Sequence, residues 1–112
     1  MENHSQALEQ VFNMLGDTKP DVVSHRIVHG GTVFNKPSFI TSKEEELIRA
    51  LSDLAPLHNP PALKGLEAIR QIFPNLPQVG VFDTAFHQTI PHENHAYALP
   101  DEFCQKYGIR KY

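Results

Sequence analysis

The chain has 112 residues, of which 40% are apolar, so it can form one small domain or part of a larger one. Its 10 Lys and Arg residues against 13 Asp and Glu residues give a net charge of −3, which argues against a nucleic-acid partner. No apolar run approaches the roughly 20 residues of a membrane helix, so no membrane partner is expected. The start, MENH, lacks the features of a signal peptide, and the single cysteine, Cys104, suits a reducing compartment. These features predict a cytoplasmic protein.

The first half of the chain is predicted to form a helix, a strand and a second helix. Residues 5–15 carry apolar side chains at helical spacing, and Gly16 is a natural stop. Residues 21–29 are rich in Val and Ile and predict a strand, which the glycine pair at 30–31 breaks in a tight turn. Thr41 and Ser42 then begin two overlapping capping boxes. The helix that follows has a core-facing stripe and ends at Pro56; the stripe consists of Leu47, Ile48, Leu51 and Leu54.

The second half predicts a helix, a buried strand and two short terminal elements. Asn59-Pro60-Pro61 opens a helix that Pro74 closes. Residues 78–82 are short and apolar, which predicts a strand buried on both faces. Residues 100–107 predict a short helix ending at Gly108, and residues 109–112 a strand. Helices that alternate with buried strands indicate an α/β layer.

Polar side chains follow both principal strands. In α/β layers, ligands collect beyond the carboxyl ends of the strands. Asp83-Thr84 comes directly after residues 78–82, and Arg26 lies near the end of the earlier strand. An arginine suits a planar carboxylate or a phosphoryl group, because its fork of donors binds two oxygens at once. The loop containing His58 precedes a helix whose free N–H groups are expected to face an anion.

Each of these polar features also has a simpler interpretation. Arg26 and Asp83 can equally form a structural ion pair without a catalytic role. The three histidines His87, His92 and His95 have no cysteine partner and straddle a proline, which favours surface histidines over a zinc site. The glycine pair lacks the established phosphate-loop patterns, so no metal or nucleotide site is predicted from these motifs.

Five segments resemble the acetate kinase family in order and spacing. They are SHRIVHGG (residues 24–31), LAPLHNPPAL (54–63), VFDTAFHQTIP (81–91), YALP (97–100) and YGIRKY (107–112). The resemblance covers nearly everything from residue 22 onwards, and propionate and butyrate kinases share much of it. It implies an α/β fold in which residues 1–112 are a partial N-terminal domain of the ribonuclease H-like (actin-like ATPase) type. The implied reaction is reversible transfer of the γ-phosphoryl group of ATP to acetate, giving acetyl phosphate and ADP.

The resemblance also implies roles for five residues. Arg26 would bind the substrate carboxylate and help to neutralise the transferring phosphoryl group, and His58 would stabilise the transition state. Asp83 would be an active-site residue, better interpreted as an orienting group than as a base, because a carboxylate nucleophile is already ionised at neutral pH. Val28 and Leu57 would line the apolar pocket for the alkyl group of the substrate.

Two family segments are missing from this sequence, namely the N-A-G-S-S-S turn and the G-F-H-G-T-S-H motif with the second domain after it. The main binding residues for ATP and Mg²⁺ are therefore expected outside this chain, which is expected to be inactive alone. Acetate or another short-chain carboxylate, ATP and ADP are the implied ligands, and the family forms homodimers. The alternatives are a propionate or butyrate kinase, or a non-catalytic product of a truncated gene.

Overall fold

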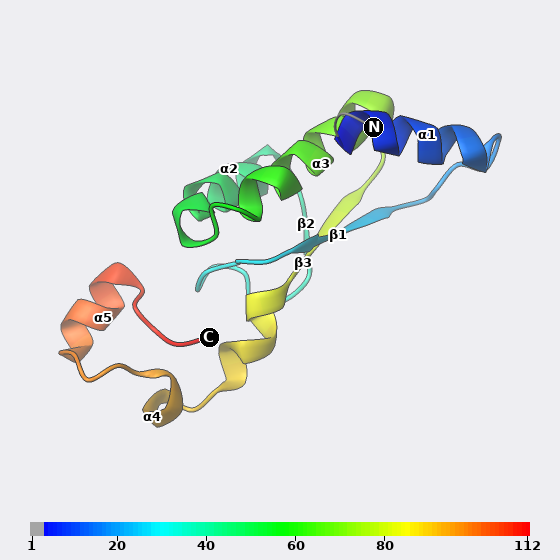
Figure 1. Ribbon diagram of the computed structural model, residues 1–112. Coiled ribbons are helices and arrows are strands. Elements are labelled where there is room, and N and C mark those ends of the chain that lie inside the picture. The colour runs from blue at the N-terminus through cyan, green and yellow to red at the C-terminus, as the bar shows by residue number, and fades with distance from the viewer. Residues whose placement is uncertain (1–3) are drawn as a thin grey trace.

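The computed structural model describes residues 4–112 and shows a small sheet with helices packed on one face (Figure 1). Residues 1–3, part of the start that argued against a signal peptide, lie outside the described residues. The elements follow in the order α1 (His4–Leu15), β1 (Val23–Ile27), β2 (Ser38–Phe39), α2 (Ser42–Ala50), the 3-10 turn η1 (Ser52–Leu54), α3 (Asn59–Ile72), β3 (Gln78–Phe82), the 3-10 helix η2 (Asp83–Thr89), α4 (His92–His95) and α5 (Asp101–Tyr107). The mixed α/β architecture predicted from the sequence is confirmed.

β3 is the central strand of the sheet, and the order across the sheet is β1-β3-β2. β1 pairs in parallel with β3, in a register that places Ile27 opposite Phe82. β2, which the sequence did not predict, is two residues long and pairs antiparallel with β3, with Phe39 opposite Val79. The parallel pair brings the carboxyl ends of β1 and β3 to the same edge of the sheet.

The strands differ from the prediction in three respects. β1 is shorter than the predicted 21–29, because the chain leaves the sheet before the glycine pair. β3 is not buried on both faces, since alternate residues are buried but Val81 is 42% exposed on the face away from the helices. Residues 109–112 do not form a strand. Instead, the Tyr112 ring packs edge-on against His29, with 4.8 Å between ring centroids.

α1, α2 and α3 lie where the helical spacing predicted them. Thr41 caps α2, because its hydroxyl accepts a hydrogen bond from the Lys43 N–H and its own N–H donates to the Glu44 carboxylate. Ser42, which was predicted to begin a second capping box, is the first residue of the helix. The apolar stripe ends sooner than predicted, since the chain tightens into η1 and Leu54 is 57% exposed.

The core lies between the sheet and the two helices α2 and α3. The rings of Phe34 and Phe82 stack there with centroids 4.1 Å apart. α1 packs on the outside of α3, where the Phe12 ring meets the Phe73 ring edge-on. The buried cluster consists of Ile27, Phe34, Ile40, Ile48, Leu63, Leu66 and Phe82.

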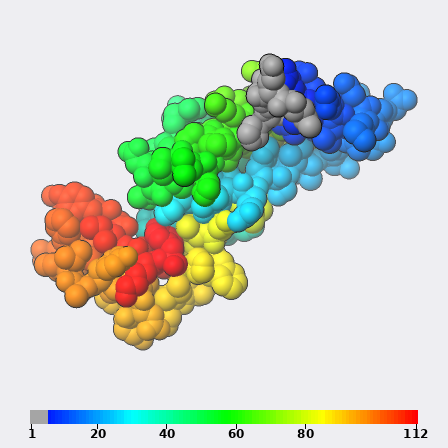
Figure 2. Space-filling model, viewed as in Figure 1, coloured from blue at the N-terminus to red at the C-terminus, as the bar shows by residue number. Residues whose placement is uncertain are grey.

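α4 and α5 lie beyond the carboxyl ends of β1 and β3, and Figure 2 shows them as an orange and red lobe at one end of the molecule. Neither helix contains a buried residue. As predicted, α5 ends at Gly108, which has a left-handed backbone with φ +63°. The tail after α5 is tied to η2 by Arg110, which donates to the Gln88 side chain (3.1 Å) and to the His87 carbonyl (2.8 Å). Within residues 4–112, no helix is both long and apolar enough to cross a membrane.

Candidate active site

The carboxyl ends of β1 and β3 bring Arg26 and Asp83 together. Arg26 is the fourth residue of β1 and lies opposite Val81, so that Asp83, directly after β3, falls within reach of its guanidinium. Arg26 Nε lies 3.0 and 3.1 Å from the two carboxylate oxygens of Asp83, and Nη2 lies 2.8 Å from Oδ2. These bonds hold the pKa of the Asp83 carboxyl below its usual range and raise the pKa of Arg26.

The contact with Asp83 uses only the Nε and Nη2 groups of the Arg26 guanidinium. A guanidinium has five N–H donors, and the Nη1 group of Arg26 has no hydrogen-bond partner among the described residues. The Arg26 side chain is 79% exposed. Arg26 is therefore oriented by Asp83 and keeps donors available for the oxygens of a ligand.

An open groove of about 310 Å³ lies beside Arg26. It separates two walls, which we call the strand wall (Arg26 and Val28) and the helix wall (Leu57, His58, Pro61 and Ala62). Four of the five residues implied by the resemblance therefore line one groove. The fifth, Asp83, does not line it but binds Arg26 and lies near enough to His58 for the histidine to help lower the pKa of Asp83.

The start of α3 does not offer the free N–H groups that the sequence was expected to place there. The Asn59 N–H is bonded to the Ala55 carbonyl (2.9 Å), and the Ala62 N–H is bonded to the His58 carbonyl (3.1 Å). Residues 60 and 61 are prolines and have no N–H. The prediction of an anion site made by free N–H groups is wrong, and the donors that face the groove are side chains.

The loop that follows β1 contains His29, Gly30 and Gly31, and it is held by side chains whose role the sequence analysis missed. Thr84 Oγ1, which is buried, accepts a hydrogen bond from the Gly30 N–H at 2.8 Å. Gln88 Nε2 donates to the Gly31 carbonyl at 3.0 Å. The Gly31 N–H donates to His29 Nδ1, and burial lowers the pKa of His29, which favours the neutral imidazole that this bond needs. The signal was present in the FDTAFHQ segment, whose polar residues after β3 bind the backbone of the glycine pair.

Asn59, also missed, connects the same loop to α3. Its side chain is fully buried and makes two hydrogen bonds with the backbone of His29. The sequence placed this asparagine at the start of a helix but carried no indication of its long-range partner. The loop after β1 is therefore held from η2 and from α3.

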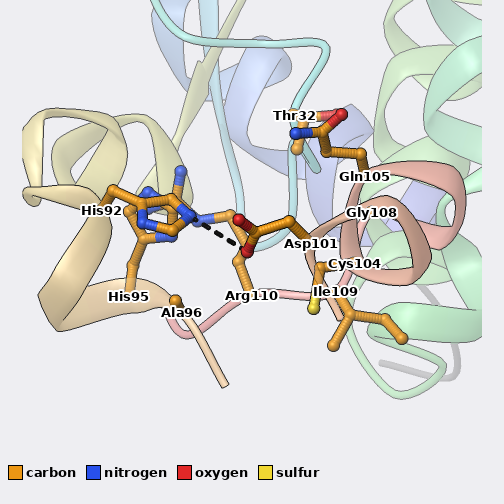
Figure 3. A pocket seen from close by; sticks show the side chains of 10 residues that line it. All are labelled: Thr32, His92, His95, Ala96, Asp101, Cys104, Gln105, Gly108, Ile109 and Arg110. Carbon is orange, nitrogen blue, oxygen red and sulfur yellow. Dashed lines mark ion pairs between the residues drawn. The ribbon is translucent and has the colours of Figure 1, made fainter. Parts of the chain in front are cut away.

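A second cavity, of about 230 Å³, lies between the α4–α5 lobe and the loop after β1 (Figure 3). His92 and Asp101 face each other there at 3.7 Å, and His95 and Cys104 also line the wall. None of the five implied residues belongs to this cavity. Among residues 4–112, no three His, Cys, Asp or Glu side chains are placed to hold a metal ion.

Comparison with known proteins identifies the family. The sequence matches the acetokinase family model over residues 1–112. The chain belongs to the acetokinase family. It is 46% identical to an acetate kinase of Alkaliphilus metalliredigens (strain QYMF), in an alignment that covers 100% of this chain and 31% of the relative.

Two solved structures of acetokinase relatives resemble this chain closely. A propionate kinase from Francisella tularensis subsp. tularensis SCHU S4 matches with a TM-score of 0.89 and 44% identity, over 97% of this chain and 29% of that one. Porphyromonas gingivalis acetate kinase matches with a TM-score of 0.87 and 42% identity, over 100% of this chain and 30% of that one. The predicted fold class, part of a ribonuclease H-like (actin-like ATPase) domain, is confirmed by this likeness. The chain spans about 30% of the length of these acetokinase relatives.

Proposed function

We propose that this chain forms the carboxylate-binding part of an acetate kinase-type phosphotransferase. The reaction is reversible transfer of the ATP γ-phosphoryl group to acetate, which gives acetyl phosphate and ADP. The observation that carries the proposal is the groove in which Arg26, Val28, Leu57 and His58 meet, although they come from two distant segments. A cation beside an apolar wall suits a short-chain carboxylate, which has a charged head and a short alkyl tail.

The chemistry needs positioned donors more than a base. Phosphoryl transfer passes through a loose, charge-spread transition state, so that donors aimed at the transferring group lower the barrier. Arg26 and His58 supply such donors on opposite walls. The acetate nucleophile is ionised at neutral pH, which leaves no proton for a general base to remove. Asp83 then acts as an orienting residue, because its carboxylate fixes one side of the Arg26 guanidinium.

ATP and Mg²⁺ are the proposed co-substrate and cofactor of the complete enzyme. No three His, Cys, Asp or Glu side chains among residues 4–112 are placed to hold a metal ion, and the Asp83 carboxylate is engaged by Arg26. We propose that the main binding residues for ATP and Mg²⁺ lie outside this chain. Residues 1–112 are proposed to be part of an N-terminal domain. For the complete enzyme we propose a homodimer in the cytoplasm.

Propionate or butyrate is the second candidate substrate. The 44% identity to a solved propionate kinase supports this candidate, beside the 46% and 54% identity to relatives named acetate kinase. One methylene group changes substrate discrimination by only about 1–3 kcal/mol. The groove is apolar along Val28, Leu57, Pro61 and Ala62, and accepts either alkyl group.

The test is a chimaera in which these residues replace the matching segment of Porphyromonas gingivalis acetate kinase. Acyl phosphate is trapped with hydroxylamine in the presence of ATP, Mg²⁺ and either acetate or propionate. We expect activity, and we expect Arg26→Ala to lower kcat by about 100-fold or more, because a transition-state donor is lost. Arg49→Ala is the control, since Arg49 is another exposed, ion-paired arginine, bonded to Glu67.

Two results would contradict the proposal. One is a folded chimaera without activity towards either acid, which would fit the product of a truncated gene that has lost function. The other is normal turnover in Arg26→Ala. The isolated 112-residue chain, assayed in the same way with circular dichroism to confirm folding, is expected to give no product. Product from it would show that a nucleotide site exists within this chain.

A further inference from the structure

Asn59 is a buried residue that directly follows His58 of the helix wall and does not itself line the groove. Its exposed fraction is 0%, although asparagine side chains are mostly found at protein surfaces. Its Oδ1 accepts a hydrogen bond from the His29 N–H at 3.2 Å, and its Nδ2 donates to the His29 carbonyl at 3.0 Å. One side-chain amide thus binds both backbone groups of one residue, as a neighbouring strand would.

These two hydrogen bonds connect the two walls. His29 directly follows Val28 of the strand wall, and Asn59 directly follows His58 of the helix wall. Among the hydrogen bonds of the described residues, they are the ones that join the loop after β1 to the start of α3. Thr84 and Gln88 hold the same loop, but they bind it to η2, which lines neither wall.

We propose that Asn59 is a positioning residue of the carboxylate site, which sets the separation of the strand wall and the helix wall. The choice of acetate as the ligand rests on the proposed function. The link between the two walls rests only on the hydrogen bonds between Asn59 and His29. Asn59 does not line the groove and acts through His29 and His58.

The contact requires an amide in particular. The His29 N–H needs an acceptor and the His29 carbonyl needs a donor, and an amide supplies both at once. An alanine supplies neither, and it leaves two polar backbone groups unpaired in a buried site. An ionised aspartate accepts from the N–H but places a negative oxygen against the carbonyl. A protonated aspartate again has one acceptor and one donor, so that Asn59→Asp should regain the link in acid.

Gln78 offers a matched control. It is also a buried amide, with an exposed fraction of 5%, and it also ties the sheet to α3, by donating to the Leu66 carbonyl at 3.3 Å. It lies at the opposite end of β3 from the groove. Gln78→Ala should therefore lower the stability of the same helix–sheet packing without moving the two walls.

The experiment uses the 112-residue chain labelled with ¹⁵N and measures two quantities in each variant. The first is protection of the His29 N–H from hydrogen exchange, which reports its bond to Asn59. The second is the Kd of acetate, from the amide shifts of Val28 and His58 during a titration. In Asn59→Ala we expect His29 protection to fall by about tenfold or more beyond the change in global stability, and the Kd to rise by at least about fivefold. In Gln78→Ala the His29 protection and the Kd of acetate should both stay within about twofold of the wild-type values, once the change in global stability is taken into account.

The Asn59→Asp variant tests whether the link needs one acceptor and one donor on the side chain. At neutral pH the ionised carboxylate repels the His29 carbonyl and weakens the link, so His29 protection should be lower than in wild type. It should recover as the pH falls and the buried carboxyl takes up a proton. Unchanged His29 protection in Asn59→Ala, or equal loss of acetate affinity in Gln78→Ala, would overturn the inference. If the wild-type chain binds no acetate, the ligand named here is contradicted for this chain, while the chimaera still tests the proposed function and His29 protection still decides whether Asn59 joins the walls.

Discussion

Arg26 and Asp83 are 57 positions apart in the sequence, and three hydrogen bonds join their side chains at the carboxyl ends of β1 and β3. The parallel register of the two strands sets this pairing, because Arg26 lies opposite Val81 and Asp83 comes two residues later. The ion pair is exposed, so that its effect on stability is small and its main consequence is the direction of the guanidinium.

The contribution of Asp83 to the free energy of unfolding should change with pH only in the acid range. The folded-state pKa of Asp83 is lowered, chiefly by the hydrogen bonds from Arg26. Its contribution is therefore fully present above the unfolded-state pKa of about 3.9, and is lost as the pH falls through the folded-state value. Urea unfolding of wild type and Asp83→Asn should differ by a constant amount from about pH 7 to pH 5, and the difference should shrink below about pH 4. A difference that widens in acid would contradict this assignment.

Thr84→Val should destabilise the chain more than Thr84→Ser. The valine keeps the shape of the side chain but leaves the buried Gly30 N–H without an acceptor, which costs about 1–3 kcal/mol. The serine keeps the hydroxyl and loses one methyl group, which costs about 0.8 kcal/mol. Urea unfolding of the three proteins measures both changes. A valine variant as stable as the serine variant would show that the Gly30 hydrogen bond contributes no more than one buried methyl group.

Alanine at Gly30 and alanine at Gly65 should change stability in opposite directions. A Cβ at Gly30 would lie 2.9 Å from Phe34 Cβ and 3.0 Å from Phe82 Cβ, and both atoms are held by the stacked rings. Gly30→Ala should therefore lower the free energy of unfolding by about 1–3 kcal/mol. Gly65 lies within α3, where a Cβ would meet only His25 Nδ1, at 3.9 Å. Gly65→Ala should raise the midpoint of urea unfolding, by an amount that corresponds to about 0.5–1 kcal/mol.

Thr41 and Ser42 should respond differently to alanine, although the sequence predicted a capping box at each. Only Thr41 occupies the N-cap position, and its hydroxyl accepts from the Lys43 N–H. Thr41→Ala should lower stability by about 1 kcal/mol. Ser42→Ala should stay within about 0.5 kcal/mol of wild type, because Ser42 is an exposed first-turn residue. Thermal or urea unfolding of the two variants would distinguish them, and a larger loss in Ser42→Ala than in Thr41→Ala would place the cap at Ser42 instead.

The sequence predicted the parts of this fold that rest on local periodicity. The apolar spacing of α1 and α3 and the threonine cap of α2 are visible within a few residues of one another, so no knowledge of neighbours is needed. The meeting of Arg26 and Asp83 was one of the interpretations that the sequence left open, since Arg26 lies near the end of one predicted strand and Asp83 directly follows another. The missing N–H groups at the start of α3 could have been predicted as well, because two prolines stand there.

The other features depend on what lies next to a segment in space. β2 has two residues and no pattern, and exists because it can pair with β3. Composition could not show that Val81 would stay exposed, because exposure depends on which face the helices cover. Residues 109–112 have strand propensity but pair with none of the strands among residues 4–112, and the ring of Tyr112 packs on His29 instead. The hydrogen bonds of Asn59 and Thr84 reach residues far away in the sequence, so a local motif could at most mark these side chains as polar and could not name their partners.

The strand order β1-β3-β2 also constrains how the chain can fold as it is synthesised. β1 and β2 leave the ribosome first, but they do not pair with each other, because the strand between them is made last. Among the described strands, no pairing can therefore form until residues 78–82 have emerged, and until then neither β1 nor β2 has its partner β3. Such late, non-local pairing slows folding and prolongs the exposure of apolar segments. The nascent chain is expected to gain its groove in the same step as its sheet, after α1, α2 and α3 have already been made.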